Sequence, residues 1–485
     1  MKTSRIFALI LAGILLASSF TSCSKKDDEK SEDSGANVDA SAVVGEDEGN
    51  FAVPEGVAEG KEFNLYIALA SCKQSYIAEE ETGAEINDAV YQRNALTEEW
   101  TGAKLNFVGS TRTTSGGDQG LETNQLRTWM QAGDTTYDAY VHVQHTGMPT
   151  LIEEGMFVDW NEIPYINIDN PWWYSNVERD ISFGDKIFCM TGDYNLDSFS
   201  NTACIIFNKS MCDELGLEYP YQMVKDGTWT HDKFVDYIKA ATKDINGDGK
   251  MTYADDRYGF SGWMYEQIPA LFVGYGGEGI VKDDNNLPKM NIDNELTYTI
   301  VDKMLEVFEL EGSSYISVND GSGLDNKMFN EGRLLFNDSF FVHVPGTREL
   351  EDMDVGFVPY PKLDEDQENY YSRTANVSGL TYIPVTNTDL EKTGAVLETL
   401  AYFSGDTILS TYFDIILTIK STRDIESEEM IPIIKDSSRF MDAIFSFSAT
   451  NIITAKQGNT LSSYVAANMD AWETRLESLI ELYTE

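Results

Sequence analysis

Histidine and cysteine are scarce in this chain of 485 residues, which contains four and five of them. The sequence has no H-E-x-x-H helix, no G-x-S-x-G elbow and no C-x-x-C pair, which excludes familiar signatures of zinc proteases, serine hydrolases and zinc ribbons. Basic residues are also few, with 35 Lys and Arg against 81 Asp and Glu and a formal net charge of −46. Such a chain repels nucleic acid and anionic membrane surfaces, so neither is an expected partner.

Apolar runs long enough to span a membrane are absent after the N-terminus. At the N-terminus, Lys2 and Arg5 precede the apolar run 6–17, which is too short for a comfortable span and is typical of a signal peptide. The tetrad that ends at Cys23, Phe-Thr-Ser-Cys, resembles the lipobox of bacterial lipoproteins. We therefore expect cleavage after residue 22 and lipid on Cys23. An ordinary secretory signal with an incidental cysteine is the alternative.

The next segment has the composition of a tether. Residues 23–61 are rich in Asp, Glu, Ser, Lys and Gly, and they cannot bury enough apolar surface to fold alone. We expect them to link the lipid to the globular part, with the lipid as the only membrane anchor. Outside the cell the remaining cysteines could form a disulfide or stay as buried free thiols, and the sequence leaves both alternatives open. These cysteines are Cys72, Cys189, Cys204 and Cys212.

Beyond the tether, segments with strand character alternate with segments of helical periodicity. This alternation favours an α/β fold with mainly parallel sheets that helices cover on both faces. The tail from residue 390 is expected to be mostly helical. The predicted strands are 63–70, 104–108, 137–143, 203–208, 258–261, 290–292, 333–336, 355–359 and 380–384, and the main predicted helices are 85–101, 121–132, 230–242, 296–310 and 461–482.

Six segments, in this order, resemble those of the extracellular solute-binding proteins of sugar-type ABC importers, the maltose-binding-protein-like family 1. Together they cover nearly the whole chain after the tether. The segments are NDAVYQRN at 87–94, IP at 163–164 with NPWW at 170–173 and GD at 192–193, IFNK at 206–209, GTWTHDKF at 227–234, FNEGRLLFN at 329–337 and DVGFVPYPK at 354–362.

The resemblance implies a type II periplasmic-binding-protein-like fold, in which two α/β lobes are joined by three hinge crossings and hold the ligand between them. We place the crossings near 201–205, 335–340 and 378–383. The expected lobes are 62–202 plus 339–380 for the first and 204–336 plus 384–485 for the second.

The resemblance also implies a function. We expect a monomeric, lipid-anchored, extracytoplasmic protein that captures a carbohydrate, an oligosaccharide in particular, and delivers it to the permease subunits of an ABC transporter. Ligand would stabilise a closed form that the permease binds, and this needs no catalytic residue. One alternative is a lipid-anchored carbohydrate-active hydrolase, because carboxylate spacing is uninformative in so acidic a chain. Another is a binding protein for a non-sugar solute such as a peptide.

Residues 244–255 fit the loop pattern of an EF-hand, with oxygen-bearing side chains at alternate positions, as Ca²⁺ requires. An aspartate replaces the usual glutamate at position twelve, which shortens its reach. We expect a structural calcium site of modest affinity, and a turn that only ends the preceding helix is the alternative. The expected ligands are Asp244, Asn246 and Asp248 at positions one, three and five, the Lys250 carbonyl at seven, Thr252 at nine and Asp255 at twelve.

Sugar sites stack aromatic rings on the C–H faces of the ligand and place polar side chains around its hydroxyl groups. We therefore selected aromatic and polar residues next to the predicted strand ends and crossings, where ordinary packing is the alternative role of each. Phe341 and the adjacent pair Trp172 and Trp173 are further candidates, although adjacent aromatics after a proline more often cap a core. The predicted ligand contacts are Trp263, Phe340, Asp193, Asn195, Tyr76, Glu80, His145 and Asn376.

Overall fold

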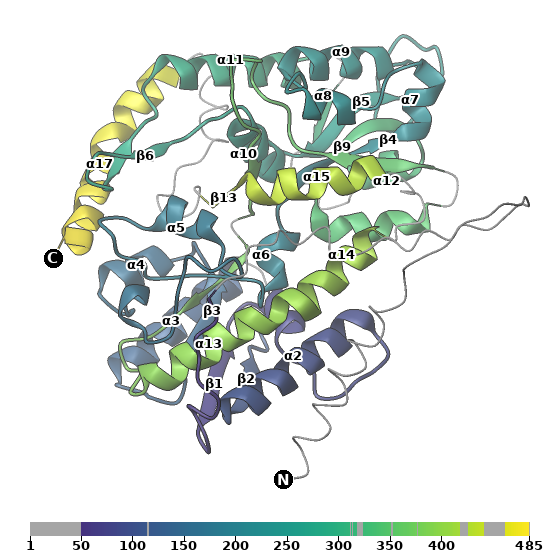
Figure 1. Cartoon of the computed structure of the whole chain (residues 1–485). Coiled ribbons are helices and arrows are strands. Elements are labelled where there is room, and N and C mark those ends of the chain that lie inside the picture. The colour runs from purple at the N-terminus through teal and green to yellow at the C-terminus, as the bar shows by residue number, and fades with distance from the viewer. Residues whose placement is uncertain are drawn as a thin grey trace, which may run out of the picture. The chain divides into compact units, whose positions relative to one another are not determined.

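Two β-sheets, each accompanied by helices, organise the part of the chain that the computed structural model describes (Figure 1). All of this part belongs to one compact unit. The signal peptide, Cys23 and most of the predicted tether lie outside the described residues, and no described helix is both long and apolar enough to cross a membrane. The described residues are 50–113, 116–310, 312, 314–317, 324–350, 353–375, 377–417, 425–440 and 461–484.

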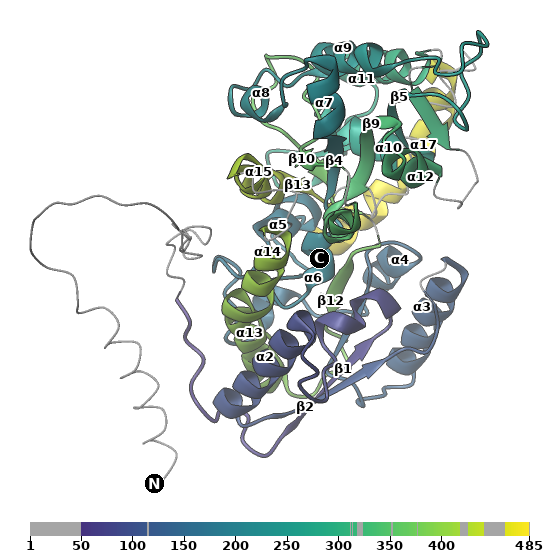
Figure 2. The same ribbon diagram turned by 90° about the vertical axis from the view of Figure 1, so that its right-hand side faces the viewer.

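The first sheet has the strand order β12-β3-β1-β2 and, with its helices, forms what we call the first lobe. β1 is parallel to both of its neighbours, and β12 joins β3 in the antiparallel sense. Helices lie on both sides of this sheet (Figure 2), so Leu65, Ile67 and Val141 are fully buried. Its elements are β1 (Glu62–Ile67), β2 (Lys104–Gly109), β3 (Ala139–Val143), β12 (Gly379–Tyr382), α2 (Glu85–Thr101), α3 (Gly116–Gln131), α4 (Met148–Glu153), α5 (Ser175–Ile181), α13 (Leu390–Ser404), η2 (Ala70–Ser75) and η3 (Trp160–Glu162).

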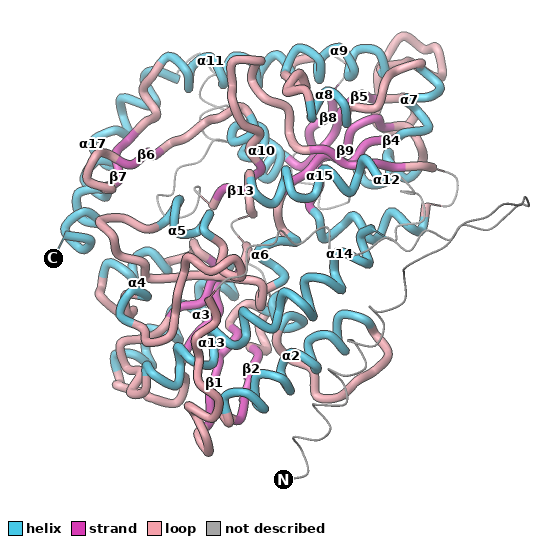
Figure 3. Tube along the Cα trace, viewed as in Figure 1, coloured by secondary structure: helices cyan, strands magenta, loops and turns pink. Residues whose placement is uncertain are grey.

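The second sheet has the order β10-β4-β9-β5-β8 and forms the second lobe (Figure 3). β5 is parallel to β8 and β9, whereas β4 is antiparallel to β9 and β10. Phe234 of α9 anchors this core, with ring centroids 4.8 Å from Phe260 and 5.3 Å from Phe336. The elements are β4 (Ala203–Asn208), β5 (Tyr258–Trp263), β8 (Ser314–Ser317), β9 (Leu334–Phe340), β10 (Val355–Val358), α7 (Lys209–Leu215), α8 (Tyr221–Lys225), α9 (His231–Ala241), α10 (Met264–Gly274), α11 (Glu295–Phe308), α12 (Leu324–Asn330) and η4 (Phe341–Glu349).

Three passages join the lobes within the described residues up to Asp436. The first leaves α6 (Leu196–Ser200) for β4, and the second runs from β11 (Ser372–Arg373) to β12. The third follows α13 through η5 (Gly405–Leu409) and α14 (Ser410–Leu417) to α15 (Ile425–Asp436), which packs on the second-lobe strand β10. The first two passages lie side by side, because Thr202 and Thr374 form an antiparallel bridge and the Ala375 amide donates to the Asn201 carbonyl over 2.9 Å.

These passages correct two of the predicted lobe boundaries. The predicted crossing at 335–340 is wrong, since β9 and the following β10 both lie in the second sheet, on either side of β4. The predicted assignment of residues from 384 onward to the second lobe is wrong for α13, which packs against α2 and β1 of the first lobe. Both errors concern which sheet a segment joins, a long-range property that local periodicity does not carry.

Three further elements lie near the passages. β13 (Ser438–Arg439) pairs with β11, and the hairpin of β6 (Ile280–Lys282) and β7 (Pro288–Met290) reaches the first lobe, where the Gly184 amide donates to the Asn286 carbonyl over 2.9 Å. The C-terminal helix α17 (Leu461–Thr484) contacts both α4 and β7, and it runs along both lobes (Figure 1, Figure 2).

Residues 50–61 correct the predicted end of the tether. Val53 and Ala58 are buried, and the Phe51 ring stacks on Tyr402 at 4.1 Å. The amides of Gly56 and Ala58 donate to carbonyls at the end of α2. This stretch therefore packs on the first lobe, because its few apolar residues find a surface there. The four cysteines within the described residues, Cys72, Cys189, Cys204 and Cys212, are buried free thiols.

Gly394 marks the tightest approach of α13 to the first lobe. A Cβ atom built on this residue would lie 1.9 Å from the Pro164 carbonyl oxygen. We expect Gly394→Ala to lower the free energy of unfolding by about 1–3 kcal/mol through overpacking. Gly117→Ala in α3 is the matched control, since its Cβ meets no described atom within 4 Å, and it should gain up to about 1 kcal/mol. Urea unfolding measures both, and equal effects would contradict the packing argument.

Candidate functional site

The first-lobe helix α5 meets β13 in the region between the two sheets (Figure 1, Figure 2). The Asn176 amide donates to the Ser438 hydroxyl over 2.6 Å, and the Arg179 guanidinium donates to the Ser438 carbonyl over 2.7 Å. Two cavities adjoin this contact, and residues of α5 and of the segment 435–439 line both of them. A ligand in either cavity therefore touches elements on both sides of the interlobe region.

The larger cavity has a volume of about 240 Å³ and a mixed aromatic and polar wall. This is below the roughly 300–1,000 Å³ of most small-molecule sites, so in this conformation the cavity suits one ring-sized group. Rings with hydroxyl and amide groups beside them are what a sugar ring requires. The described residues that line it are Pro171, Trp173, Tyr174, Ser175, Asn176, Ser198, Phe199, Thr202, Lys435, Asp436 and Ser438.

The Glu398 carboxylate holds the aromatic wall in place. It accepts hydrogen bonds from the indole nitrogens of Trp172 and Trp173, over 3.1 and 2.7 Å, and from the Asn170 amide over 2.7 Å. Burial raises the pKa of Glu398, and these hydrogen bonds lower it. Both tryptophans are buried, so their N–H groups are used in the protein, and Trp173 offers only its ring to the cavity.

Two buried oxygens near this wall, the Tyr174 hydroxyl and Asp193 Oδ1, have no hydrogen-bond partner among the described atoms. Burial raises the pKa of Asp193 to about 6, against the opposing effect of Lys435, whose ammonium lies 5.7 Å from the Tyr174 ring centroid. Burial and then the Asp193 charge hold the pKa of Tyr174 well above its usual value. Buried polar atoms without protein partners are usually completed by water or a ligand.

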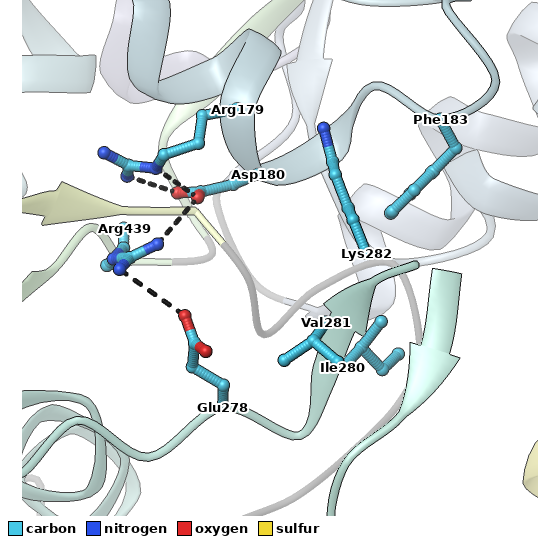
Figure 4. Close-up of a pocket in the computed structure, with 8 residues that line it drawn as sticks. All are labelled: Arg179, Asp180, Phe183, Glu278, Ile280, Val281, Lys282 and Arg439. Atoms are coloured by element: carbon cyan, nitrogen blue, oxygen red, sulfur yellow. Dashed lines mark hydrogen bonds and ion pairs between the residues drawn. The ribbon is translucent and has the colours of Figure 1, made fainter. Parts of the chain in front are cut away.

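The smaller cavity, of about 180 Å³, is lined by charged residues (Figure 4). The Asp180 carboxylate connects the charged groups of this cavity. The carboxylate accepts from Arg179 Nε over 2.7 Å and Nη2 over 2.9 Å, from Arg439 Nη1 over 3.3 Å and from the Phe440 amide over 2.9 Å. Arg439 also pairs with Glu278 over 3.4 Å. This network joins α5 of the first lobe to β13 and to the loop before β6.

Several predicted ligand contacts lie at strand ends but not in the cavities. Trp263 and Phe340 end the neighbouring parallel strands β5 and β9, so they share one edge of the second sheet. Trp263 is 42% exposed, and Phe340 is half-buried. His145 follows the end of β3 at the facing edge of the first sheet. Such edges are where open α/β sheets bind ligands, yet none of these residues, nor Asp193, is among the described residues that line either cavity.

Tyr76, Asn195 and Phe341 are buried and are not among the described residues that line either cavity, so their role as ligand contacts stays a prediction. Tyr76 is fully buried beside Phe107, Asn195 donates to the Gly379 carbonyl over 2.6 Å, and Phe341 stacks on Phe199 at 5.0 Å. Each follows a strand or precedes a passage whose chain turns inward. Glu80 lies exposed ahead of α2, away from both cavities, and Asn376 lies outside the described residues.

The cavity residues Arg179, Asp180, Lys282 and Arg439 were missed by the sequence analysis. They come from three segments that are about 100 and 160 residues apart in the chain, and no spacing rule links them. The one available signal was the NPWW segment, since Trp173 does line the larger cavity.

The predicted calcium loop forms a tight turn of backbone hydrogen bonds. The Asp244 carboxylate accepts from the amides of Gly247 and Gly249 over 2.7 and 2.8 Å, and both glycines have positive φ, +73° and +77°. Asp256, one residue after the predicted ligand Asp255, accepts from two further loop amides. Within the described residues no three His, Cys, Asp or Glu side chains are close enough together to hold a metal. The donor types suit Ca²⁺, and the calcium site stays a prediction.

Two sheets joined by three passages, with cavities between the lobes, define the fold class of two-lobed solute-binding proteins. No family model matches the sequence, and no curated protein matches it significantly. Several solved structures, in contrast, share the fold of this chain. The galacto-N-biose/lacto-N-biose I-binding protein of an ABC transporter from Bifidobacterium longum, in complex with lacto-N-biose, has a TM-score of 0.56 and 12% identity, over 87% of this chain and 97% of its own.

Two other structures carry the same fold. A cyclo/maltodextrin-binding protein complexed with maltotetraose gives a TM-score of 0.55 with 13% identity, over 88% of this chain and 98% of its own. The UgpB protein of Mycobacterium tuberculosis, in complex with glycerophosphocholine, gives 0.53 with 11% identity, over 87% and 100%. At these identities the likeness confirms the predicted two-lobed type II α/β fold and leaves the ligand to the residues of this chain.

Asp193 makes the stability of the protein depend on pH in an unusual direction. Its pKa is about 6 in the folded chain and lower in the unfolded chain, so the folded state binds the extra proton between these values and loses stability as pH rises to 6. Asp193→Asn removes this penalty. Relative to the native protein, we expect the variant to gain roughly 2–3 kcal/mol between pH 4 and pH 7. Urea unfolding at both pH values measures the difference, and a pH-independent difference would contradict the assignment.

Proposed function

We propose that this protein is an extracytoplasmic solute-binding protein that captures a carbohydrate between its two lobes and delivers it to an ABC permease. The observation that carries the proposal is the larger cavity, because Trp173, Tyr174 and Phe199 supply ring surfaces there among hydroxyl, amide and ammonium groups. The partnerless Tyr174 hydroxyl beside this wall supports a hydroxylated ligand. The similar proteins crystallised with lacto-N-biose and maltotetraose agree with this cargo class.

The proposed mechanism is a hinge motion between two lobes. The paired passages at Thr202 and Thr374 form a short axis, about which the lobes can open without disturbing either sheet. A ligand that touches α5 and the segment 435–439 together favours the closed form, since it loses half its contacts on opening. The closed form is then the species that the permease distinguishes from the empty protein.

We also propose that the chain is held at the membrane by lipid on Cys23. The support is the signal-like segment 1–22 and the lipobox-like tetrad that ends at Cys23. Residues 24–49 then provide the tether. Globomycin, which blocks lipoprotein signal cleavage, should leave the precursor uncleaved, and Cys23→Ser should release the protein from the membrane fraction.

Binding is tested with the chain from Ser24 onward, which retains every described residue. We expect one class of mono- or oligosaccharide to raise the unfolding free energy by about 2.7 kcal/mol at 100 times its dissociation constant. Chromatography should show the sugar unchanged, since capture needs no turnover. Product formation would support the hydrolase alternative, and stabilisation by peptides alone would contradict carbohydrate cargo.

Tyr174→Phe tests whether the larger cavity is the binding site. Deleting a buried hydroxyl that lacks a protein partner should leave the unfolding free energy unchanged or slightly higher. Losing a hydrogen bond to ligand should weaken sugar binding about fivefold to tenfold, equivalent to roughly 1–1.4 kcal/mol. Calorimetric titration measures the affinity, and Tyr91→Phe, on the exposed face of α2 and outside both cavities, is the control. Unchanged affinity in Tyr174→Phe would place the ligand elsewhere.

We propose, in addition, that residues 244–255 bind Ca²⁺ as a structural ion. Calcium at 10–100 times its dissociation constant should raise the unfolding free energy by roughly 1–3 kcal/mol, and a chelator should reverse this. Asp248→Ala, which removes the side-chain oxygens at position five, should abolish the calcium effect. Asp364→Ala is the matched control, because Asp364 also accepts backbone amides in an exposed turn but lies outside the loop. If calcium does not change the unfolding free energy, or if both variants lose the calcium effect equally, the loop is only a turn and not a calcium site.

A further inference from the structure

The smaller cavity reverses the charge balance of the whole chain. The described residues that line it include three cations, Arg179, Lys282 and Arg439, and two carboxylates, Asp180 and Glu278, in a protein with more than twice as many acidic as basic residues. Asp180 is already saturated by two guanidinium groups and a backbone amide. Its charge still acts on Lys282 through space, where it raises the pKa of the ammonium against the effect of burial.

Lys282 donates its hydrogen bonds to neutral acceptors, while the carboxylates of Asp180, Glu178 and Asp185 act on it only through space. Its ammonium donates to the Ser182 hydroxyl over 3.1 Å and to the Glu178 carbonyl over 3.3 Å, and it lies 5.6 Å from the Phe183 ring centroid. Among the described residues, no carboxylate oxygen forms an ion pair with it. The side chain is partly buried, and burial lowers its pKa. A half-buried ammonium with only neutral acceptors retains much of its desolvation penalty, which an anion would offset.

Arg439 and Lys282 line the cavity from different elements, and the apolar side chains of Ile280 and Val281, which precede Lys282 on β6, line it as well (Figure 4). Its guanidinium stacks on the Tyr371 ring at 4.4 Å, and its contact with Glu278 is long, 3.4 Å. Burial raises the pKa of Glu278, and the charge of Arg439 lowers it. The cavity thus offers an ammonium, a planar guanidinium and an apolar floor, a set that suits an anionic group on an organic ring.

We propose that the smaller cavity binds the anionic group of an acidic carbohydrate, a carboxylate or a sulfate ester, and that the cargo is therefore a charged rather than a neutral sugar. This rests on the proposed function and adds its substrate class. Residues of α5, the hairpin strand β6 and β13 line the cavity, so the anion contacts both lobes and reinforces the closed form. The chemistry is the same for both anions, and the ligands used in the test separate them.

The test compares acidic sugars with neutral partners of the same skeleton. Trigalacturonate is paired with its methyl ester, and galactose 6-sulfate with galactose, each titrated into the chain from Ser24 onward. We expect at least one acidic member to bind about tenfold or more tightly than its neutral partner, and this advantage to shrink with added salt. The pair that shows the advantage names the anion.

Lys282→Met assigns the preference to the cavity. The variant should lose most of the tighter binding of acidic over neutral sugars, and its affinity for neutral sugars should change by less than about twofold. Lys289→Met is the matched control, because Lys289 lies exposed on the partner strand β7 of the same hairpin, outside the cavity. Its acidic advantage should persist.

The outcomes separate this inference from the proposed function. Neutral sugars that bind as tightly as acidic ones, or a Lys282→Met variant that weakens both equally, would overturn the anion site and leave carbohydrate capture standing. Binding of no sugar of either kind would overturn both. If Lys282→Met lowers the unfolding free energy, its intact neutral binding still shows a folded site.

Discussion

Among the described residues, the Asp180 carboxylate binds charged groups on both sides of the contact between the lobes. It holds Arg179 on its own helix through two short hydrogen bonds, and it reaches Arg439 and the Phe440 amide on the other side. Removing every partner from a buried carboxylate is strongly destabilising. Because Arg179 stays with Asp180 when the lobes part, the charge remains paired in an open form. The contact between the lobes can therefore break without leaving a buried charge unpaired. The proposed reversible hinge motion requires such a contact.

The aromatic wall depends on a second buried carboxylate for the opposite reason. Glu398 is fixed within the first lobe, where three side chains and a backbone amide saturate it. The described hydrogen-bond partners of Glu398 all belong to the first lobe, so the proposed opening would leave Trp172 and Trp173 in place. The first lobe thus carries a preformed ring surface, which reduces the ordering cost of binding. Lys435 and Arg439 of the segment 435–439 supply positive charge to the cavities, and the proposed closure would bring that charge to the preformed ring surface.

Local elements followed from the sequence because their causes are local. The helix predicted at 85–101 and the strand predicted at 203–208 occur at those residues, since apolar spacing and flanking turns determine them. The lobe membership of β10 and α13 did not follow, because a strand pairs with whichever edge is free across the fold. The site was harder still. Tyr76 follows a strand end and Asn195 precedes the first crossing, so both look accessible in sequence, but the chain folds them inward. Arg179 and Arg439 meet only after both lobes have formed.

The acidity of the chain bears directly on what the smaller cavity can hold. A formal net charge of −46 repels an anion at long range, but at physiological salt that field decays over a Debye length of about 8 Å. Contacts inside a partly buried cavity are screened far less, so Lys282 and Arg439 act at short range where the distant carboxylates do not. An anion would then associate slowly and be held by local contacts. Its affinity would therefore be determined mainly by a slow dissociation rate. For the proposed capture role this arrangement is useful. A general surface field would attract every anion in the surroundings, whereas local contacts would select anions attached to a sugar that also fills the aromatic cavity.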